Sequence, residues 1–208
     1  MSDQRWRTAL HESAHAVVAL LIGVDVDLVS IRPGKAHAGI SFPVMPGWHG
    51  DVRRAAATPG PFVDPELRRV VEMRAVVSLA GDIGAMLQGP APSRYGSTRD
   101  ERLAESLSRK LERLSPRHVE LLHDAEEVTE HRDDYGLATD ALAALGNGNQ
   151  ISAHLVWLRT VAAKLVRDYA DEIVAVAEQL YRRHVMTGAE IRAAMRAVQP
   201  RTKEHRMT

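Results

Sequence analysis

Two histidines near the start of the chain, His11 and His15, have the spacing that most directly indicates chemistry. On a helix, side chains four positions apart lie on one face, so both imidazoles can reach one metal ion. Glu12 lies about 100° around the helix axis from His11, where its carboxylate can reach a water held by the ion. The pattern H-E-x-x-H therefore predicts zinc ligands at His11 and His15 and a general base at Glu12, as in zinc peptidases.

The motif requires a helix, and the surrounding residues predict one over residues 3–23. Asp3 can cap its N-terminus and Gly23 can end it. Apolar residues recur at helical spacing and would bury the segment: Trp6, Ala9, Leu10, Ala14, Val17, Val18 and Leu21. The alternative interpretation is that both histidines are hydrogen-bonded helix residues and that Glu12 is solvated.

A catalytic zinc ion needs three protein ligands and an open position. The chain has no cysteine, so the ligands must supply nitrogen or oxygen. His15 is not followed by the x-x-G-x-x-H extension, so the third ligand must come from elsewhere. Spacing alone leaves five candidate carboxylates: Glu66, Glu72, Asp100, Glu101 and Glu105.

The other elements follow from periodicity and from turn residues. Alternating apolar residues over 26–42, broken by Pro33-Gly34, predict a β-hairpin, the only convincing β signal. Its edge could bind an extended peptide beside the metal, or the hairpin could be a purely structural ribbon. Residues 43–65 predict a long loop. Further helices are expected over residues 64–88, 97–114, 115–134, 151–185 (one long or two abutting) and 188–198, the last capped by Thr187.

Gly81 and Gly84, in the helix expected over residues 64–88, would let the zinc helix approach closely. The fold expected is mainly α, a zincin-like helical metallopeptidase domain with a small antiparallel β-hairpin near the active site. At 208 residues, the chain suits one domain. We expect a zinc-binding part over 1–114, a C-terminal helical part over 115–198 and a disordered tail over 199–208.

Composition narrows the classes of partner. Lys+Arg and Asp+Glu both number 27, so the charge does not suggest nucleic acid or an anionic membrane. The opening residues lack the pattern of a signal peptide, and the longest apolar run is too short to span a bilayer. The sequence therefore predicts a cytoplasmic protein without a membrane span. Apolar positions on the last long helices could serve the core or a homo-oligomer.

Several of these segments, in order, resemble the peptidase domain of the FtsH family of ATP-dependent zinc metalloproteases. Residues 11–19 are similar to that family's HEAGHAVVA, and residues 96–104 are similar to its GASNDLxxA. The closing turn Thr187-Gly188-Ala189-Glu190-Ile191 resembles the family's L-T-G-x-E-I. In the family, the aspartate of the second segment is the third zinc ligand, so the resemblance implies that Asp100 completes the site.

The chain departs from this family at two places. Ala14 stands where the family has glycine, before the second histidine. The family's run glycine-arginine-alanine-alanine-glutamate is Gly81-Asp82-Ile83-Gly84-Ala85, so an acidic group expected on that helix is missing or moved. The ATPase module and membrane anchors found in that family are not seen in this sequence, so a separate ATPase or adaptor would have to deliver folded substrates.

Together these observations predict a zinc metalloendopeptidase that hydrolyses unfolded or flexible polypeptides. Two alternatives stay open. One is a non-catalytic module that binds another protein and descends from such a peptidase. The other is a regulatory protease that cuts one dedicated target.

Overall fold

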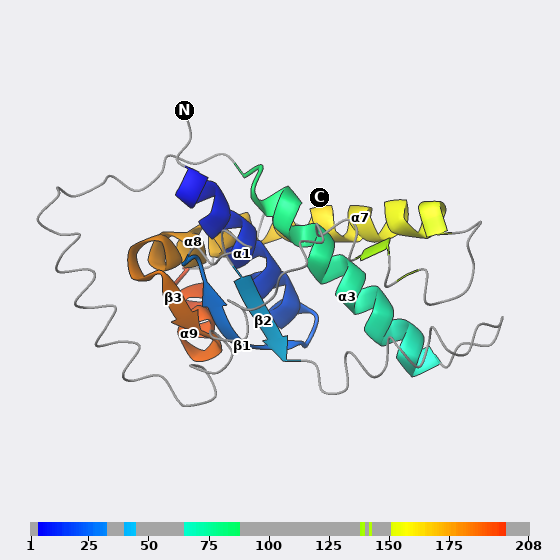
Figure 1. Ribbon diagram of the computed structural model, residues 1–208, viewed down its shortest axis with the longest axis horizontal. Helices are drawn as coiled ribbons and strands as arrows, with labels where there is room; N and C mark the ends of the chain where they lie inside the picture. Colours follow the sequence, from blue (N-terminus) through cyan, green and yellow to red (C-terminus); the bar gives the residue numbers. More distant parts are fainter. Residues whose placement is uncertain are drawn as a thin grey trace, which may run out of the picture.

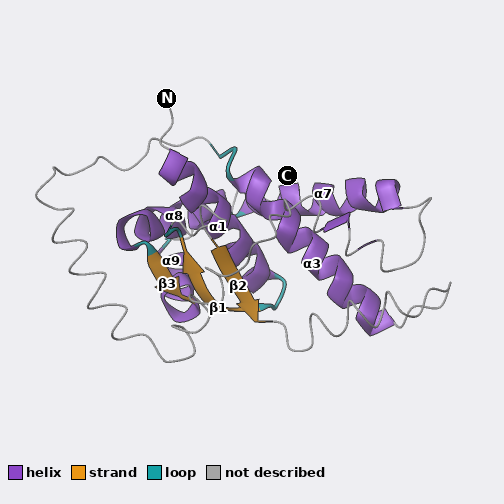
Figure 2. Cartoon of the chain, in the orientation of Figure 1, coloured by secondary structure: helices purple, strands orange, loops and turns teal. Residues whose placement is uncertain are grey.

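The computed structural model describes residues 4–32, 40–44, 65–87, 138–139, 142 and 151–198. Within these residues the chain forms five helices and three strands, which confirms the expectation of a mainly helical fold with an antiparallel hairpin (Figures 1 and 2). The helices expected over 97–114 and 115–134 and the tail lie outside the described part. The long loop expected over residues 43–65 was wrong at its ends, because residues 43 and 44 belong to a strand and Pro65 begins a helix; the rest of it also lies outside the described part.

The first helix, α1 (Gln4–Leu21), lies at the centre of the molecule (Figure 1). It contacts strands β1 and β2 and helices α3 and α8. Every residue from 12 to 19 is buried, so all of the motif except His11 has little contact with solvent. Gly23 ends the helical segment in a left-handed conformation with φ of 84°, as its position in the sequence predicts.

A three-stranded antiparallel sheet packs beside α1 in the order β2-β1-β3. Strands β1 (Asp25–Ser30) and β2 (Ile40–Val44) form the predicted hairpin, with Val29 opposite Ser41. Strand β3 (Val185–Thr187) pairs with the other edge of β1, with Val29 opposite Met186. Among the described strands, β1 therefore joins segments from both ends of the chain.

Two predictions were wrong at the same place. Residues 26–42 do not hold all of the strands, and the helix expected to continue to about Val185 ends earlier. Helix α8 stops at Arg183, where His184 turns the backbone left-handed with φ of 66°. The next three residues form β3. Three residues are too few for an alternating pattern, and their partner strand lies more than 150 positions away.

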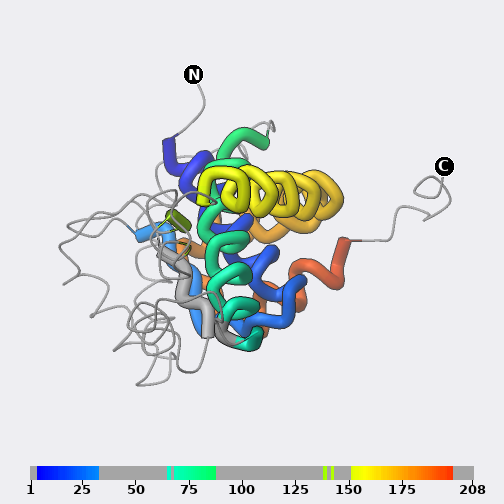
Figure 3. The backbone as a smooth tube through the Cα atoms, turned by 90° about the vertical axis from the view of Figure 1, so that its right-hand side faces the viewer, coloured from blue at the N-terminus to red at the C-terminus, as the bar shows by residue number. Residues whose placement is uncertain are grey.

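Helix α3 (Pro65–Gly84) begins at the expected proline and runs beside α1. Helix α7 (Ile151–Asp168) crosses it, as the view turned by 90° shows (Figure 3). Helix α8 (Ala170–Arg183) follows after Tyr169, so residues 151–183 form two abutting helices, one of the two arrangements expected. Most apolar positions of both helices face the core, whereas Val156 and Trp157 of α7 are exposed.

The last helix, α9 (Gly188–Ala197), starts with the predicted cap, Thr187, which forms a capping box with Glu190. The Glu190 amide donates to Thr187 Oγ1, and the Thr187 amide donates to Glu190 Oε2 at 2.8 Å. Such a cap contributes about 1 kcal/mol to helix stability. No helix in the described part of the chain is both long enough and apolar enough to cross a membrane.

Candidate metal centre

The two histidines of the motif lie together on α1. Their Nε2 atoms are 3.1 Å apart, and their rings meet edge to face with centroids 4.6 Å apart. Two nitrogens that bind one tetrahedral zinc ion at about 2.0–2.1 Å lie roughly 3.3 Å apart. The helix therefore brings both nitrogens close to the separation that a shared zinc ion requires.

A hydrogen bond of His15 Nδ1 determines which nitrogen of this ring carries the proton. His15 Nδ1 lies 2.7 Å from the carbonyl oxygen of Val77 on α3. A carbonyl oxygen can only accept, so Nδ1 must donate and a neutral His15 has its lone pair on Nε2. A hydrogen bond from the second ring nitrogen to a carbonyl is the usual support of a metal-binding histidine.

Because Gly81 has no side chain, the His15 ring can lie against α3 and reach the Val77 carbonyl. A Cβ atom built on Gly81 would lie 2.3 Å from His15 Nε2 and 2.8 Å from His11 Cε1. Any side chain at this position would therefore enter the space beside the nitrogen that faces the neighbouring histidine. The sequence predicts a close approach of helices at Gly81, but it gives no sign that the atoms approached are the histidine rings.

Glu12 is buried beside these histidines, with only 5% of its surface exposed. Burying a carboxylate costs free energy unless other groups compensate its charge. The alternative interpretation correctly places the histidines within hydrogen-bonding distance, but it is wrong in expecting a solvated Glu12. The motif thus has two nitrogens turned toward each other and a carboxylate held out of solvent.

Asp82 places an acidic group on α3 close to the first histidine of the motif. Its Oδ1 lies 3.7 Å from His11 Nδ1, the ring nitrogen that does not face His15. In this chain the acidic group on α3 beside His11 is therefore Asp82. Sequence reasoning missed this role, because nothing in the spacing of Asp82 connects it with a residue 71 positions earlier.

The remaining departure from the FtsH pattern involves two residues that touch. A Cβ atom on Gly84 would lie 2.2 Å from the Cβ of Ala14. In the pattern, glycine stands at position 14 and alanine at position 84, so this chain carries the methyl group on the opposite helix. In this chain the methyl group of Ala14 occupies the space that a side chain at position 84 would enter.

The continuous helix α3 removes two candidates for the third ligand. Gly81 touches the histidines, and Glu72 lies nine residues before it, about 13 Å along the helix axis. Glu72 instead accepts from Arg68 at 2.9 Å and lies 3.0 Å from His154. Glu66 is farther still, so both are beyond the reach of the site.

Three candidates stay predictions, because Asp100, Glu101 and Glu105 lie outside the described residues. No group of three metal-ligating side chains occurs within the described ranges. The residues present fit a zinc ion in donor chemistry, separation and support, with His11 and His15 as two ligands. A third protein ligand for such an ion would have to come from outside the described residues.

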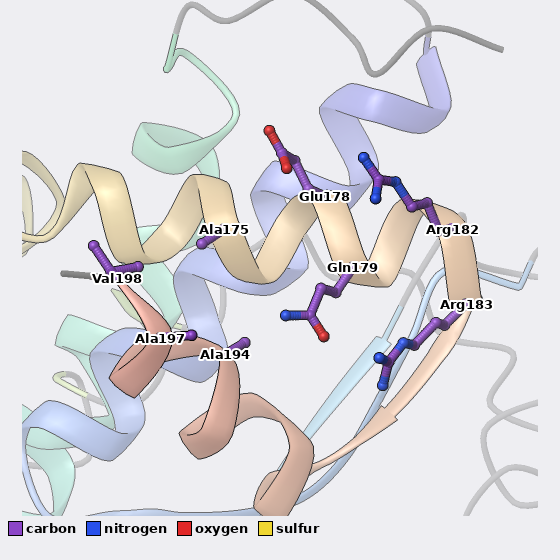
Figure 4. A pocket seen from close by; sticks show the side chains of 8 residues that line it. All are labelled: Ala175, Glu178, Gln179, Arg182, Arg183, Ala194, Ala197 and Val198. Atoms are coloured by element: carbon purple, nitrogen blue, oxygen red, sulfur yellow. The ribbon is translucent and has the colours of Figure 1, made fainter.

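A separate groove of about 550 Å³ lies between α8 and α9. Figure 4 shows Gln179 and Arg183 leaving α8 on the side of α9, the helix that carries Ala194 and Ala197. Arg183 is already paired with Glu190 at 3.2 Å. No histidine lines this groove, and its lining residues come from other helices than the motif, so we assign it no part in the metal chemistry.

Comparison with known proteins adds no identification: no family model matches the sequence, and no curated protein matches it.

Proposed function

We propose that the protein is a zinc metallopeptidase whose catalytic centre is built on helix α1. The observation that carries this proposal is the 3.1 Å separation of the His11 and His15 Nε2 atoms, beside a buried Glu12. The His15 contact with Val77 supports it, because this contact leaves the Nε2 lone pair available to a metal. Asp100 is the proposed third ligand, on the resemblance of residues 96–104.

Each residue has a separate task in the proposed reaction. His11 and His15 hold the ion, which when bound acts as a Lewis acid that activates water and polarises the peptide carbonyl. Glu12 accepts a proton from the attacking water on its carboxylate and then donates it to the leaving amine nitrogen. The carbon–oxygen bond to water forms first, and the carbon–nitrogen bond breaks when the amine nitrogen receives the proton from Glu12, which thereby returns to a carboxylate.

The proposed substrates are unfolded or flexible polypeptides, and the proposed fold class is a zincin-like peptidase domain of the FtsH type. The strand β2 lies at an edge of the described sheet and contacts α1, which supports a role in holding an extended chain near the motif. Folded substrates would need a separate ATPase or adaptor. Cytoplasmic location belongs to the same proposal.

Replacement of Glu12 by glutamine tests the proposal, because it keeps the side-chain shape and removes the base. We expect Glu12→Gln to bind zinc as the wild type does and to lose at least about 100-fold in cleavage of an unfolded, fluorescently labelled polypeptide. The matched control is Glu66→Gln, an exposed residue at the far end of α3, which should keep full activity.

Two results would contradict the proposal. Unchanged proteolysis by Glu12→Gln would remove Glu12 from the mechanism. A zinc-loaded wild type that binds unfolded polypeptides without cleaving them would instead support the non-catalytic binding module. A third result would refine the proposal and not contradict it: a single protein that accumulates in cells carrying Glu12→Gln would favour the dedicated regulatory protease.

A further inference from the structure

Helix α3 supports the two motif histidines in different ways. His15 is buried, with 7% of its surface exposed, and its Nδ1 donates to a backbone carbonyl. The His11 side chain is 25% exposed, and its Nδ1 faces the carboxylate of Asp82. A neutral acceptor therefore supports one histidine and a charged acceptor supports the other.

We propose that Asp82 is a positioning residue that orients His11 for metal binding and raises the affinity of the site for zinc. This inference rests on the proposed function. It concerns a residue outside the H-E-x-x-H motif and outside the third-ligand segment. Asp82 would act only through His11, without binding the metal itself.

The geometry separates this role from that of a ligand. His11 Nε2 faces His15 Nε2, whereas Asp82 approaches Nδ1, on the other side of the His11 ring. A metal held by both Nε2 atoms requires a proton on His11 Nδ1, and a carboxylate is the strongest acceptor for that proton. The carboxylate also makes the ring a better electron donor to the metal.

The distance is compatible with this role. At 3.7 Å the two atoms are farther apart than in a direct hydrogen bond. The Asp82 side chain is 62% exposed, so it has room to close the gap or to hold a bridging water. Because it is exposed, its replacement should leave the packing between α1 and α3 intact.

The position next to Gly81 explains why the carboxylate can reach His11. Gly81 contributes no side chain and touches both rings, and Asp82 is the following residue on α3. The resemblance places arginine here, which has no acceptor for the Nδ1 proton. The proposed support is therefore a property of this chain and is not implied by the resemblance.

The experiment measures zinc affinity by competition with a chromophoric chelator for the wild type, Asp82→Ala and Asp82→Glu. We expect Asp82→Ala to lose about tenfold in affinity, the lower end of the effect of removing such a partner. Asp82→Glu keeps the charged acceptor and should stay close to the wild type. Glu66→Gln, on the same helix but far from the site, is the matched control for loss of one negative charge.

A second readout follows the histidine directly. With cobalt in place of zinc, the visible absorption spectrum depends on how the ligands are oriented, so it should change in Asp82→Ala and be restored in Asp82→Glu. A merely structural role for Asp82 would change neither the spectrum nor the affinity. Circular dichroism checks that each variant is folded.

The outcomes distinguish the two proposals. If the wild type binds zinc, His11→Ala loses it, and Asp82→Ala equals the wild type in affinity and spectrum, only the role of Asp82 is overturned. An equal loss in Glu66→Gln would also overturn it, because the effect would then reflect net charge. If the wild type binds no zinc, both this inference and the proposed function fail.

Discussion

Helix α1 packs against two neighbours in contrasting ways. Toward α8, Trp6 is buried with 2% of its surface exposed and meets the ring of Tyr181 edge to face at 5.9 Å. Toward α3, the contact is made by small residues, Ala14 and Gly84, and by the backbone of Gly81 against the histidines. The first contact buries large apolar groups, whereas the second brings backbones close together around polar ones.

Free energy alone favours the first kind of contact. An aromatic side chain buries 150–250 Å², which corresponds to about 4–6 kcal/mol as an upper estimate. A glycine inside a helix costs about 1 kcal/mol relative to alanine, and a buried carboxylate adds a further cost. At its two glycines the contact between α1 and α3 therefore sacrifices stability, and we infer that it is shaped around the histidines.

The largest expected effect comes from adding one methyl group at the histidines. In Gly81→Ala, the new Cβ would lie 2.3 Å from His15 Nε2, so the ring must leave its place. We expect zinc affinity to fall by more than about 100-fold, beyond the loss of a supporting hydrogen bond. Titration against a chelator measures this, with Gly84→Ala as the control that adds a methyl to α3 away from the rings. Wild-type affinity in Gly81→Ala would mean that the rings are placed differently.

The opposite side of α1 should affect stability without a specific effect on the metal. Trp6→Ala removes a large buried side chain and is expected to lower the free energy of unfolding by about 3–5 kcal/mol. Urea denaturation measures this loss. Trp157→Ala is the matched control, because Trp157 is 55% exposed on α7 and should change stability by about 0.5 kcal/mol. Equal losses in the two variants would contradict the contrast between the two contacts.

The smallest expected effect, on stability, tests whether positions 14 and 84 share the space for one methyl group. Gly84→Ala adds a Cβ 2.2 Å from that of Ala14 and should cost about 1–3 kcal/mol by overpacking. The double variant Gly84→Ala with Ala14→Gly should recover most of this loss, so the two changes are coupled. Denaturation of both single variants and the double variant measures the coupling.

A control pair combines the same kinds of substitution at two positions that do not touch each other. Gly23 has nothing within 4 Å of a built Cβ, so Gly23→Ala and Ala14→Gly should have additive effects. Additive behaviour of the Gly84 pair as well would show that Ala14 and Gly84 do not share one space.

Local signals explain what the sequence could predict. Gly23, Pro65 and Thr187 mark helix ends through their own backbone chemistry, and each lies at the end predicted for it. The spacing of His11 and His15 defines a shared face of one helix, and their Nε2 atoms do meet. These features depend on residues that are near one another in the sequence.

Features that depend on distant segments could not be predicted. Strand β3 exists because Val29 of β1 offers it a partner, and three residues alone do not indicate a strand. The support of His15 is a backbone carbonyl, at Val77, which no side-chain pattern reveals. Asp82 faces His11 only because α1 and α3 pack in this register. The assignment of Asp100 stays a prediction that rests on the resemblance.

The central claim is that His11 and His15 share one ion whose third ligand is a carboxylate from the segment after α3. A crystal of the zinc-loaded protein, measured at the zinc absorption edge, tests it most directly. The account predicts one anomalous peak within about 2.0–2.1 Å of both Nε2 atoms, with an Asp100 oxygen at a similar distance. A peak elsewhere, or Asp100 far from both rings with no other acid in its place, would contradict it.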